Sequence, residues 1–390
     1  MVTEAVLAAL VAFAVAAALT PLAARLARRI GAVDQQKDIG LAKDATPLLG
    51  GLAIFGGALV AGVLFLPDND RTEGILAAAA LITIVGALDD RFELPPIVKL
   101  AGQFLAAGVL VMSGVVVDAF TFPFLHRVEL GEFGGPLTMF ALVLLMNIVN
   151  FSDGADGLAA GVCAIAALAF AIIAFDLGRR TAGTLAMITA GAALGFLIFN
   201  FPPAKVFMGD CGSNLLGLLL GAVIIEGTLK TNALIALVGP LVVLAVPLLD
   251  TSFVVLKRLK YGRPIYRGDS NHFHHRFYRM KWSTRRSLLY LYAWTFTMAG
   301  TAVALRFIPY SERSGDLNPG WALLMGALLA LCLTASLYLV WVLEILKFRR
   351  VRAWQLRRSD PDTSEHDIDE QVDRELETGE FGQVARVPEG

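Results

Sequence analysis

Charged residues are scarce in this chain. Asp, Glu, Lys and Arg make up 17% of its 390 residues, whereas hydrophobic residues make up 56%. A soluble domain of this length would carry about a quarter charged residues, so the composition excludes that class. The mean hydropathy is +0.65, and apolar runs long enough to cross a bilayer recur along the sequence. The sequence therefore predicts an all-α, polytopic integral membrane protein.

Cysteine is also rare. Cys163, Cys211 and Cys332 are scattered along the chain without the spacing of a disulfide framework or a zinc site. A basic leader is missing before the first apolar run, 6–19, and no clear small-residue cleavage site follows it. We therefore expect this run to be a retained span and not a signal peptide.

The apolar runs predict about eleven transmembrane helices. Their expected ranges are 3–22, 47–66, 74–88, 98–117, 136–150, 157–175, 181–199, 212–228, 233–256, 287–306 and 320–346. Placing the N-terminus outside puts 26 of the 33 Lys and Arg residues on the inward side. Because inward loops of membrane proteins are enriched in Lys and Arg, we expect the N-terminus outside and the C-terminus in the cytosol.

This topology predicts two parts of the chain. Residues 1–346 form a transmembrane catalytic domain, and residues 347–390 form a cytosolic tail that is first basic and then acidic. The tail carries 11 Asp and Glu between Ser359 and Gly390 and few apolar residues, so we expect it to be disordered. The cytosolic loops are 21–46, 89–97, 151–156, 200–211 and 257–286.

Four polar clusters lie at the inward ends of the predicted spans. They are Asp89-Asp90, Asn147–Gly157, Phe207–Ser213 and Asp269–Arg276. Charges this close to a membrane span are costly and are usually functional. The acidic clusters took no part in the Lys and Arg count, so their convergence on one side independently favours a single site.

The first two clusters are rich in carboxylates and carboxamides. Asp89 and Asp90 end a span, where the helix dipole is already negative, so they need a metal, Lys99 or an arginine nearby; a solvated helix end is the alternative. In the second cluster polar residues recur as the span emerges, and an Asx-rich turn is the alternative. Its candidate ligand-binding residues are Asn147, Asn150, Asp153 and Asp156.

The other two clusters complement the first two. Asp210 stands between Gly209 and Gly212 at a helix start, which suits a phosphate and metal cradle, although Asp210 could instead cap that helix. Asn200 adds a carboxamide, and Phe207 could stack on a base or pack at the membrane interface. In the fourth cluster, three histidines and an arginine favour anionic phosphates; a basic patch for anionic lipid is the alternative. These residues are His272, His274, His275 and Arg276.

Together the clusters predict phosphoryl transfer from a nucleotide-linked donor at a membrane face. Magnesium binds through one or two carboxylates plus substrate phosphates, and cations bind the remaining phosphate charge. An ion-coupled transporter is the remote alternative, but its acidic residues should lie near mid-span on broken helices.

The same motifs resemble the polyprenyl-phosphate N-acetylhexosamine-1-phosphate transferase family. The resemblance covers roughly residues 40 to 290. The shared features are Asp89-Asp90 followed by Lys99-Leu-Ala-Gly-Gln103, NxxNxxDGxDGL from Asn147, FMGDxGS from Phe207, and the histidine loop. The unbroken HHH of the muramoyl-pentapeptide branch is interrupted here by Phe273. The pattern HxHHR is closer to the N-acetylglucosamine branch.

The resemblance implies a reaction in which a polyprenyl phosphate attacks the β-phosphate of a UDP-N-acetylhexosamine and UMP leaves. We expect N-acetylglucosamine as the sugar, with UDP-N-acetylmuramoyl-pentapeptide or another N-acetylhexosamine as the alternative. The implied cofactor is Mg2+, with Mn2+ as a substitute. The implied location is a bacterial inner membrane, and the site is expected to face the cytosol. Membrane lipids and a second copy of the chain, in a homodimer, are the further expected partners. No nucleic-acid partner is expected.

The resemblance also implies residue roles. The implied metal ligands are Asp210, Asp153 and Asp156. Asp89 and Asp90 would lie by the lipid phosphate, the first as a base or a positioning group, and His272, His274, His275 and Arg276 would hold phosphates or the sugar. The remaining implied substrate-binding residues are Lys43, Lys99, Asn147, Asn150, Asn200, Phe207 and Gly209.

Overall fold

The structure is a computed structural model of the 390-residue chain. It describes residues 2–34, 45–121, 127–227, 244, 248, 283–308, 318–341, 353–354, 356–357 and 364–378. The chain divides into two compact units, Met1–Leu248 with Leu288–Pro309, and Leu249–Ser287 with Tyr310–Gly390. The predicted span 233–256, apart from residues 244 and 248, lies outside the described residues, as do Lys43 and the histidines of the histidine loop.

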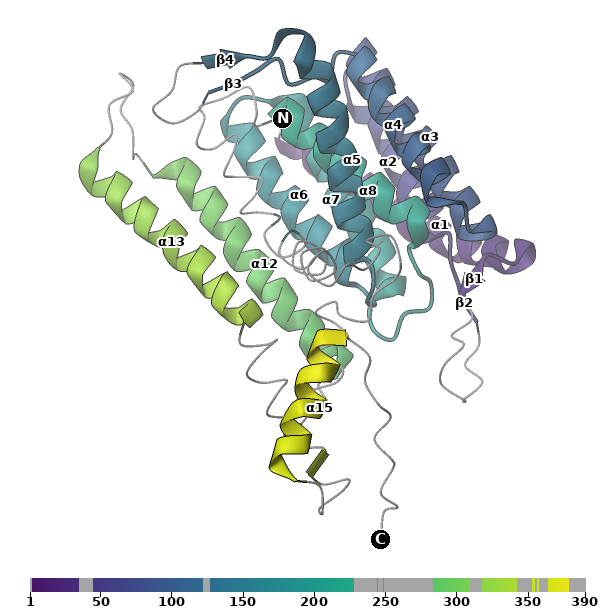
Figure 1. Ribbon diagram of the computed structural model, residues 1–390. Coiled ribbons are helices and arrows are strands. Elements are labelled where there is room, and N and C mark those ends of the chain that lie inside the picture. The colour runs from purple at the N-terminus through teal and green to yellow at the C-terminus, as the bar shows by residue number, and fades with distance from the viewer. Residues whose placement is uncertain are drawn as a thin grey trace. The chain divides into compact units, whose positions relative to one another are not determined.

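The first unit is a helical bundle (Figure 1). Its described helices are α1 (Val2–Ile30), α2 (Gly50–Phe65), α3 (Asp70–Phe92), α4 (Pro96–Met112), α5 (Gly134–Ser152), α6 (Leu158–Asp176), α7 (Arg180–Asn200), α8 (Gly209–Gly227) and α12 (Thr284–Phe307). A short 3-10 helix, Gly131–Phe133, precedes α5.

Each of the ten predicted spans within the described ranges coincides with a helix. Eight described helices are long and apolar enough to cross a membrane, and α2 and α4 are shorter apolar helices. The expectation of an all-α, polytopic membrane protein is therefore confirmed. Apolar run length predicts these helices because a backbone in lipid must satisfy its hydrogen bonds internally.

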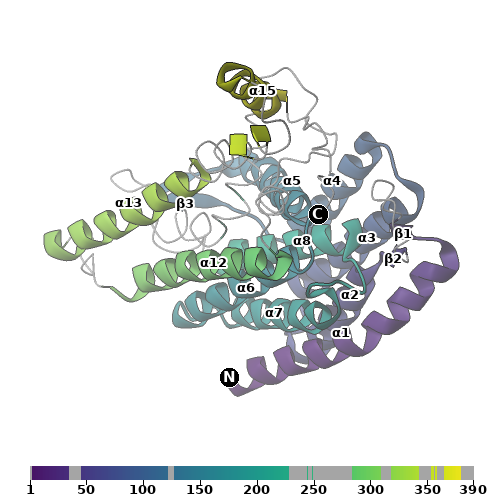
Figure 2. The same ribbon diagram turned by 90° about the horizontal axis from the view of Figure 1, so that it is seen from below.

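Small residues set the helix packing. Helix α1 lies along α7 and α2, which the two views in Figures 1 and 2 also show. At Gly191 and Gly195 of α7, an added Cβ would collide with the α1 backbone at Ala9 and Phe13. Because lipid offers no hydrophobic drive between helices, such close backbone approach supplies the van der Waals contact that holds them together.

The up-and-down course of the chain gathers the three polar clusters within the described ranges, Asp89-Asp90, Asn147–Gly157 and Phe207–Ser213, at one end of the bundle. The C-terminal end of α3 meets the N-terminal end of α8 there. At the opposite end, Arg71 of α3 pairs with Glu226 of α8 at 3.2 Å, and Arg306 of α12 pairs with Asp176 of α6 at 2.6 Å. These ion pairs join helix ends that lie away from the acidic clusters.

Short antiparallel strand pairs close both ends. Strand β1 (Val33–Asp34) pairs with β2 (Thr46–Pro47), and β3 (Ala119–Thr121) pairs with β4 (Arg127–Glu129). Segment 207–208 then runs beside residues 47–51. Its contacts are Phe207 N–H to Pro47 O at 2.9 Å, Gly50 N–H to Phe207 O at 3.0 Å and Gly51 N–H to Met208 O at 2.9 Å. These bonds fix the chain just before α8.

The described part of the second unit contains α13 (Pro319–Trp341) and α15 (Glu365–Thr378). The expectation of a tail without regular structure does not hold for α15. Its first turn is capped by Ser364, whose hydroxyl accepts a hydrogen bond from Asp367 N–H at 3.2 Å, and Arg374 pairs with Glu370 one turn earlier. Ile368 and Val372 of this helix are also buried, so its few apolar residues pack on one face while local capping and pairing support the rest.

Candidate active site

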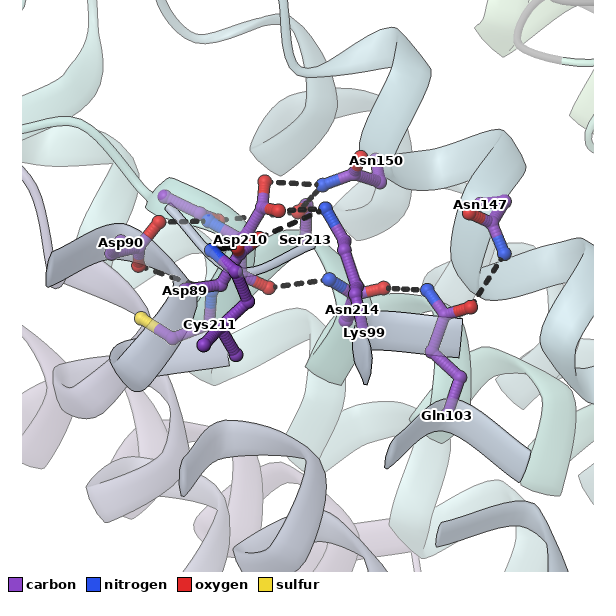
Figure 3. A network of polar contacts seen from close by, with 12 residues as sticks. Asp89, Asp90, Lys99, Gln103, Asn147, Asn150, Asp210, Cys211, Ser213 and Asn214 are labelled. Carbon is purple, nitrogen blue, oxygen red and sulfur yellow. Dashed lines mark hydrogen bonds and ion pairs between the residues drawn. The ribbon is translucent and has the colours of Figure 1, made fainter. Parts of the chain in front are cut away.

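The N-terminus of α8 is held by a carboxylate from another helix. Asp90, in the last turn of α3, accepts hydrogen bonds from Asp210 N–H at 2.6 Å and from Cys211 N–H at 3.2 Å (Figure 3). Gly209 precedes them with φ +71°, and an added Cβ there would collide with the Asp90 carboxylate. Asp90 therefore acts as the N-cap of α8, a role that the sequence analysis gave as an alternative for Asp210.

The Asp210 side chain is left free to face other polar groups. Its Oδ1 accepts a hydrogen bond from Asn150 Nδ2 at 2.7 Å, and its Oδ2 pairs with the Lys99 ammonium. Lys99 also pairs with Asp89 Oδ2 at 3.2 Å, so one lysine joins the two carboxylates. The other carboxylate oxygen of Asp89, Oδ1, accepts a hydrogen bond from Leu94 N–H at 2.8 Å, just beyond the end of α3.

A chain of buried carboxamides supports this arrangement from inside the bundle. Asn147 donates to Gln103 Oε1 at 2.8 Å, Gln103 donates to Asn214 Oδ1 at 2.7 Å, and Asn214 donates to the Asp210 carbonyl at 2.8 Å. Gln103 and Asn214 are each 1% exposed. The chain links α5, α4 and α8, and a buried polar group is costly unless it is satisfied, so these bonds fix the relative register of the three helices.

The loop between α5 and α6 carries the remaining carboxylates. Asp156 Oδ2 accepts a hydrogen bond from Ala204 N–H at 2.9 Å, which ties this loop to the segment after α7. Burial, and then the nearby charges of Asp90 and Asp156, raise the pKa of the Asp153 carboxyl well above its ordinary value. A cation beside Asp153 would favour its ionised form and so act against this shift.

Asn200, the last residue of α7, also joins the loop between α5 and α6 to the segment after α7. It is 2% exposed, its Oδ1 accepts a hydrogen bond from Gly157 N–H at 2.9 Å, and its Nδ2 donates to Val206 O at 2.9 Å. Both ends of the carboxamide are thus used within the protein, which favours a structural role over the substrate-binding role that the resemblance implied for Asn200. Phe207 is half-buried, and its backbone pairs with residues 47 and 50.

The structure brings together five of the eleven predicted site residues that it describes. Asp89, Asp90, Lys99, Asn150 and Asp210 meet directly at one end of the bundle. Their place in the first or last turns of helices also differs from the mid-span carboxylates of the transporter alternative. The predicted residues outside the described ranges are Lys43, His272, His274, His275 and Arg276.

The predicted metal set is only partly gathered. Within the described ranges, Asp210, Asp153 and Asp156 do not place three ligand oxygens within 4.8 Å of one another. Asp156 is engaged with Ala204 instead. Asp210 and Asp153 still suit a hard divalent cation, because Mg2+ needs only one or two carboxylates with substrate phosphates.

The sequence analysis assigned no role to Gln103, Ser213 or Asn214. Ser213 Oγ accepts a hydrogen bond from Asn150 Nδ2 at 2.8 Å, and the other two form the buried carboxamide chain. A signal was present in the sequence: Gln103 and Asn214 each follow a predicted site residue by four positions inside an apolar run. At that spacing they lie one helical turn deeper on the same face.

Comparison with known proteins agrees with these motifs. Residues 73–228, from α3 to α8, match the model of glycosyl transferase family 4. A probable undecaprenyl-phosphate N-acetylglucosaminyl 1-phosphate transferase of Bacillus subtilis is 38% identical over 291 residues, which cover 74% of this chain and 81% of that protein. A decaprenyl-phosphate N-acetylglucosaminephosphotransferase of Mycobacterium leprae is 35% identical over 322 residues, with the same two coverages.

A relative from the other branch is also similar. A phospho-N-acetylmuramoyl-pentapeptide-transferase of Moorella thermoacetica is 33% identical over 277 residues, which cover 66% of this chain and 84% of that protein. All three relatives carry names of sugar-phosphate transferases. The chain therefore belongs to glycosyl transferase family 4, as an enzyme of the polyprenyl-phosphate N-acetylhexosamine-1-phosphate transferase group that its motifs resemble.

Proposed function

We propose that this enzyme transfers N-acetylglucosamine 1-phosphate from UDP-N-acetylglucosamine to a membrane polyprenyl phosphate. The products are UMP and the lipid-diphosphate-sugar that starts synthesis of a cell-envelope polysaccharide. The observation that carries the proposal is the cluster of Asp89, Lys99, Asn150 and Asp210 at one end of an apolar bundle. The names of the similar Bacillus and Mycobacterium proteins support this donor and acceptor.

The main chemical difficulty is charge repulsion. The second pKa of a phosphate monoester is about 6, so the lipid phosphate arrives mostly as a dianion and needs little help from a base. An oxygen of this dianion attacks the sugar-linked phosphorus, the bond to the bridging oxygen breaks, and UMP leaves with that oxygen. Lys99 lies between Asp89 and Asp210, where its ammonium can reduce repulsion between the two anionic substrates.

The residues that would hold Mg2+, or Mn2+ in its place, are Asp210 and Asp153. When bound, the cation supplies Lewis-acid charge stabilisation for the diphosphate. Asn150 orients Asp210 by donating to its Oδ1, and Asp90 fixes the backbone that carries it. Asp89 holds Lys99 and so acts as a positioning group on the acceptor side.

The topology belongs to the same proposal. Eleven spans with the N-terminus outside place the ends of α3, α5 and α7 and the starts of α4, α6 and α8 on the cytosolic side. In this arrangement the nucleotide sugar reaches the site from the cytosol. The lipid acceptor reaches it laterally, from within a bacterial inner membrane. The ten Lys and Arg residues of segment 257–286 would then lie on the same cytosolic side of the membrane.

The test is a donor panel with the purified protein in detergent, undecaprenyl phosphate and Mg2+. UMP release is followed with UDP-N-acetylglucosamine, UDP-N-acetylgalactosamine and UDP-N-acetylmuramoyl-pentapeptide. We expect release with the first donor at least tenfold faster than with the others. Faster release with the pentapeptide donor would move the enzyme to the muramoyl branch, and no release with any donor would refute the proposed reaction.

A further inference from the structure

Tyr292 of α12 contacts the junction that carries the α5–α6 carboxylates. Its hydroxyl donates a hydrogen bond to the Gly157 carbonyl at 2.5 Å. Its ring lies against α6 so closely that a Cβ added to Gly161 would collide with it. Leu288, one turn earlier on α12, also approaches Gly157. Helix α12 therefore packs closely against the start of α6, at Gly157 and Gly161.

Gly157 is the point at which this junction is fixed from both sides. It has φ +77°, a backbone conformation that glycine adopts readily and other residues do not. Its N–H is held by Asn200 of α7 at 2.9 Å, while its carbonyl is held by Tyr292 of α12. Asp156 immediately precedes Gly157, and Asp153 lies four residues before it.

A hydroxyl on this face of α12 is not needed for packing alone. Phenylalanine would fill the same space against Gly161, and the Gly157 carbonyl already accepts the helical hydrogen bond from Gly161 N–H at 3.0 Å. The tyrosine hydroxyl adds a second, directional bond at the residue where the turn becomes a helix. Two bonds from different helices, on the N–H and the carbonyl of one glycine, restrict rotation of the turn that carries the carboxylates.

We propose that Tyr292 is a positioning residue that fixes the turn bearing Asp153 and Asp156 for catalysis. The inference rests on the proposed function, because it assigns these carboxylates to the reaction.

The test compares Tyr292→Phe with the wild type and with Thr297→Val as a matched control. Thr297 lies on the same helix, and its hydroxyl bonds to Ala293 O within that helix at 2.8 Å. We expect Tyr292→Phe to lower kcat about 10- to 100-fold, because a displacement of about 1 Å at a catalytic group can cost about 100-fold. KM for the lipid acceptor should stay within about threefold, and Thr297→Val should keep kcat within about twofold.

Hydrogen exchange gives a readout that does not depend on turnover. In Tyr292→Phe, the amides of peptide 153–161 should exchange at least about tenfold faster, while peptides of α1 and α7 stay unchanged. Gly161→Ala should give the same local change by another route, since it keeps the hydroxyl but displaces the ring. Unchanged exchange together with kcat within twofold of wild type would overturn the proposal.

The two proposals fail differently. If the wild type releases no UMP with any donor, the proposed function is wrong, yet faster exchange in Tyr292→Phe still supports the positioning of the turn. If the wild type is active and Tyr292→Phe lowers only the melting temperature, with kcat unchanged, the tyrosine is structural and the inference is refuted.

Discussion

The assignment of Asp90 as the N-cap of α8 makes a quantitative prediction. Asp90 accepts two backbone hydrogen bonds, from Asp210 at 2.6 Å and from Cys211 at 3.2 Å, at a helix end with positive partial charge. Asp90→Asn keeps one acceptor oxygen but loses the charge and presents an NH2 group to the other N–H. Because a hydrogen bond to a charged group contributes about 1.5–3 kcal/mol, we expect a loss of about 1–2 kcal/mol in unfolding free energy.

The same substitution should also lower turnover, through Asp210. Loosening of the first turn of α8 moves the carboxylate that Asn150 and Lys99 hold, and a shift of about 1 Å can reduce kcat about 100-fold. If Asp90 were instead a general base, Asp90→Asn would lower the rate by about 10²–10⁴ without lowering stability. The combination of lost stability and lost turnover therefore distinguishes the cap from the base.

Asn69 offers a matched control at the other end of the bundle. Its side chain caps α3 by accepting a hydrogen bond from Thr72 N–H at 3.0 Å. Asn69→Ala should cost about 1 kcal/mol, the typical value for a lost N-cap, with kcat within about twofold of wild type. The assays are unfolding in a mixed detergent series and UMP release at saturating Mg2+. Wild-type stability of Asp90→Asn, or an equal loss of kcat in Asn69→Ala, would refute the capping argument.

Three further predictions concern the site and its topology. Asp210→Asn should reduce UMP release by at least about 10³-fold while the protein still inserts and purifies, and near wild-type release would remove Asp210 from the site. Gln103→Leu leaves the Asn147 and Asn214 amides short of a partner, so the midpoint of unfolding should fall by the equivalent of about 1–3 kcal/mol; an unchanged midpoint would contradict a stabilising carboxamide chain. A cysteine at position 179 should react with an impermeant reagent from outside and one at position 267 only from the cytosol; labelling from one side would refute the topology.

The helices could be predicted from the sequence because each depends on its own segment. An apolar run of about 20 residues must be helical in lipid, whatever packs beside it. The run 74–88 therefore predicted α3, although the helix extends to Phe92 and carries Asp89 and Asp90 within its last turn. Consecutive spans cross the membrane in opposite directions, so the polar clusters at their inward ends were expected on one side. That expectation also needs no knowledge of which helices pack side by side.

The partners of the carboxylates could not be predicted in the same way. The sequence analysis left a metal, Lys99 or an arginine open for Asp89 and Asp90, and nothing in the sequence distinguishes the two. In the structure they diverge, because Asp89 reaches Lys99 while Asp90 reaches the backbone of α8. That difference depends on how closely α3 approaches α8, which Gly86 permits by lying against Cys211. Lateral contacts of this kind join residues more than 100 positions apart.

The placement of cations is central to the chemistry of this site. Lys99 is the lysine that pairs with both Asp89 and Asp210. Asp90 accepts hydrogen bonds from the N-terminus of α8, and burial, followed by the nearby charges of Asp90 and Asp156, raises the pKa of Asp153. A dianionic lipid phosphate and a diphosphate would bring further negative charge to this end of the bundle. A divalent cation held by Asp153 and Asp210 would offset part of this negative charge and would lower the repulsion that opposes the approach of the two phosphates.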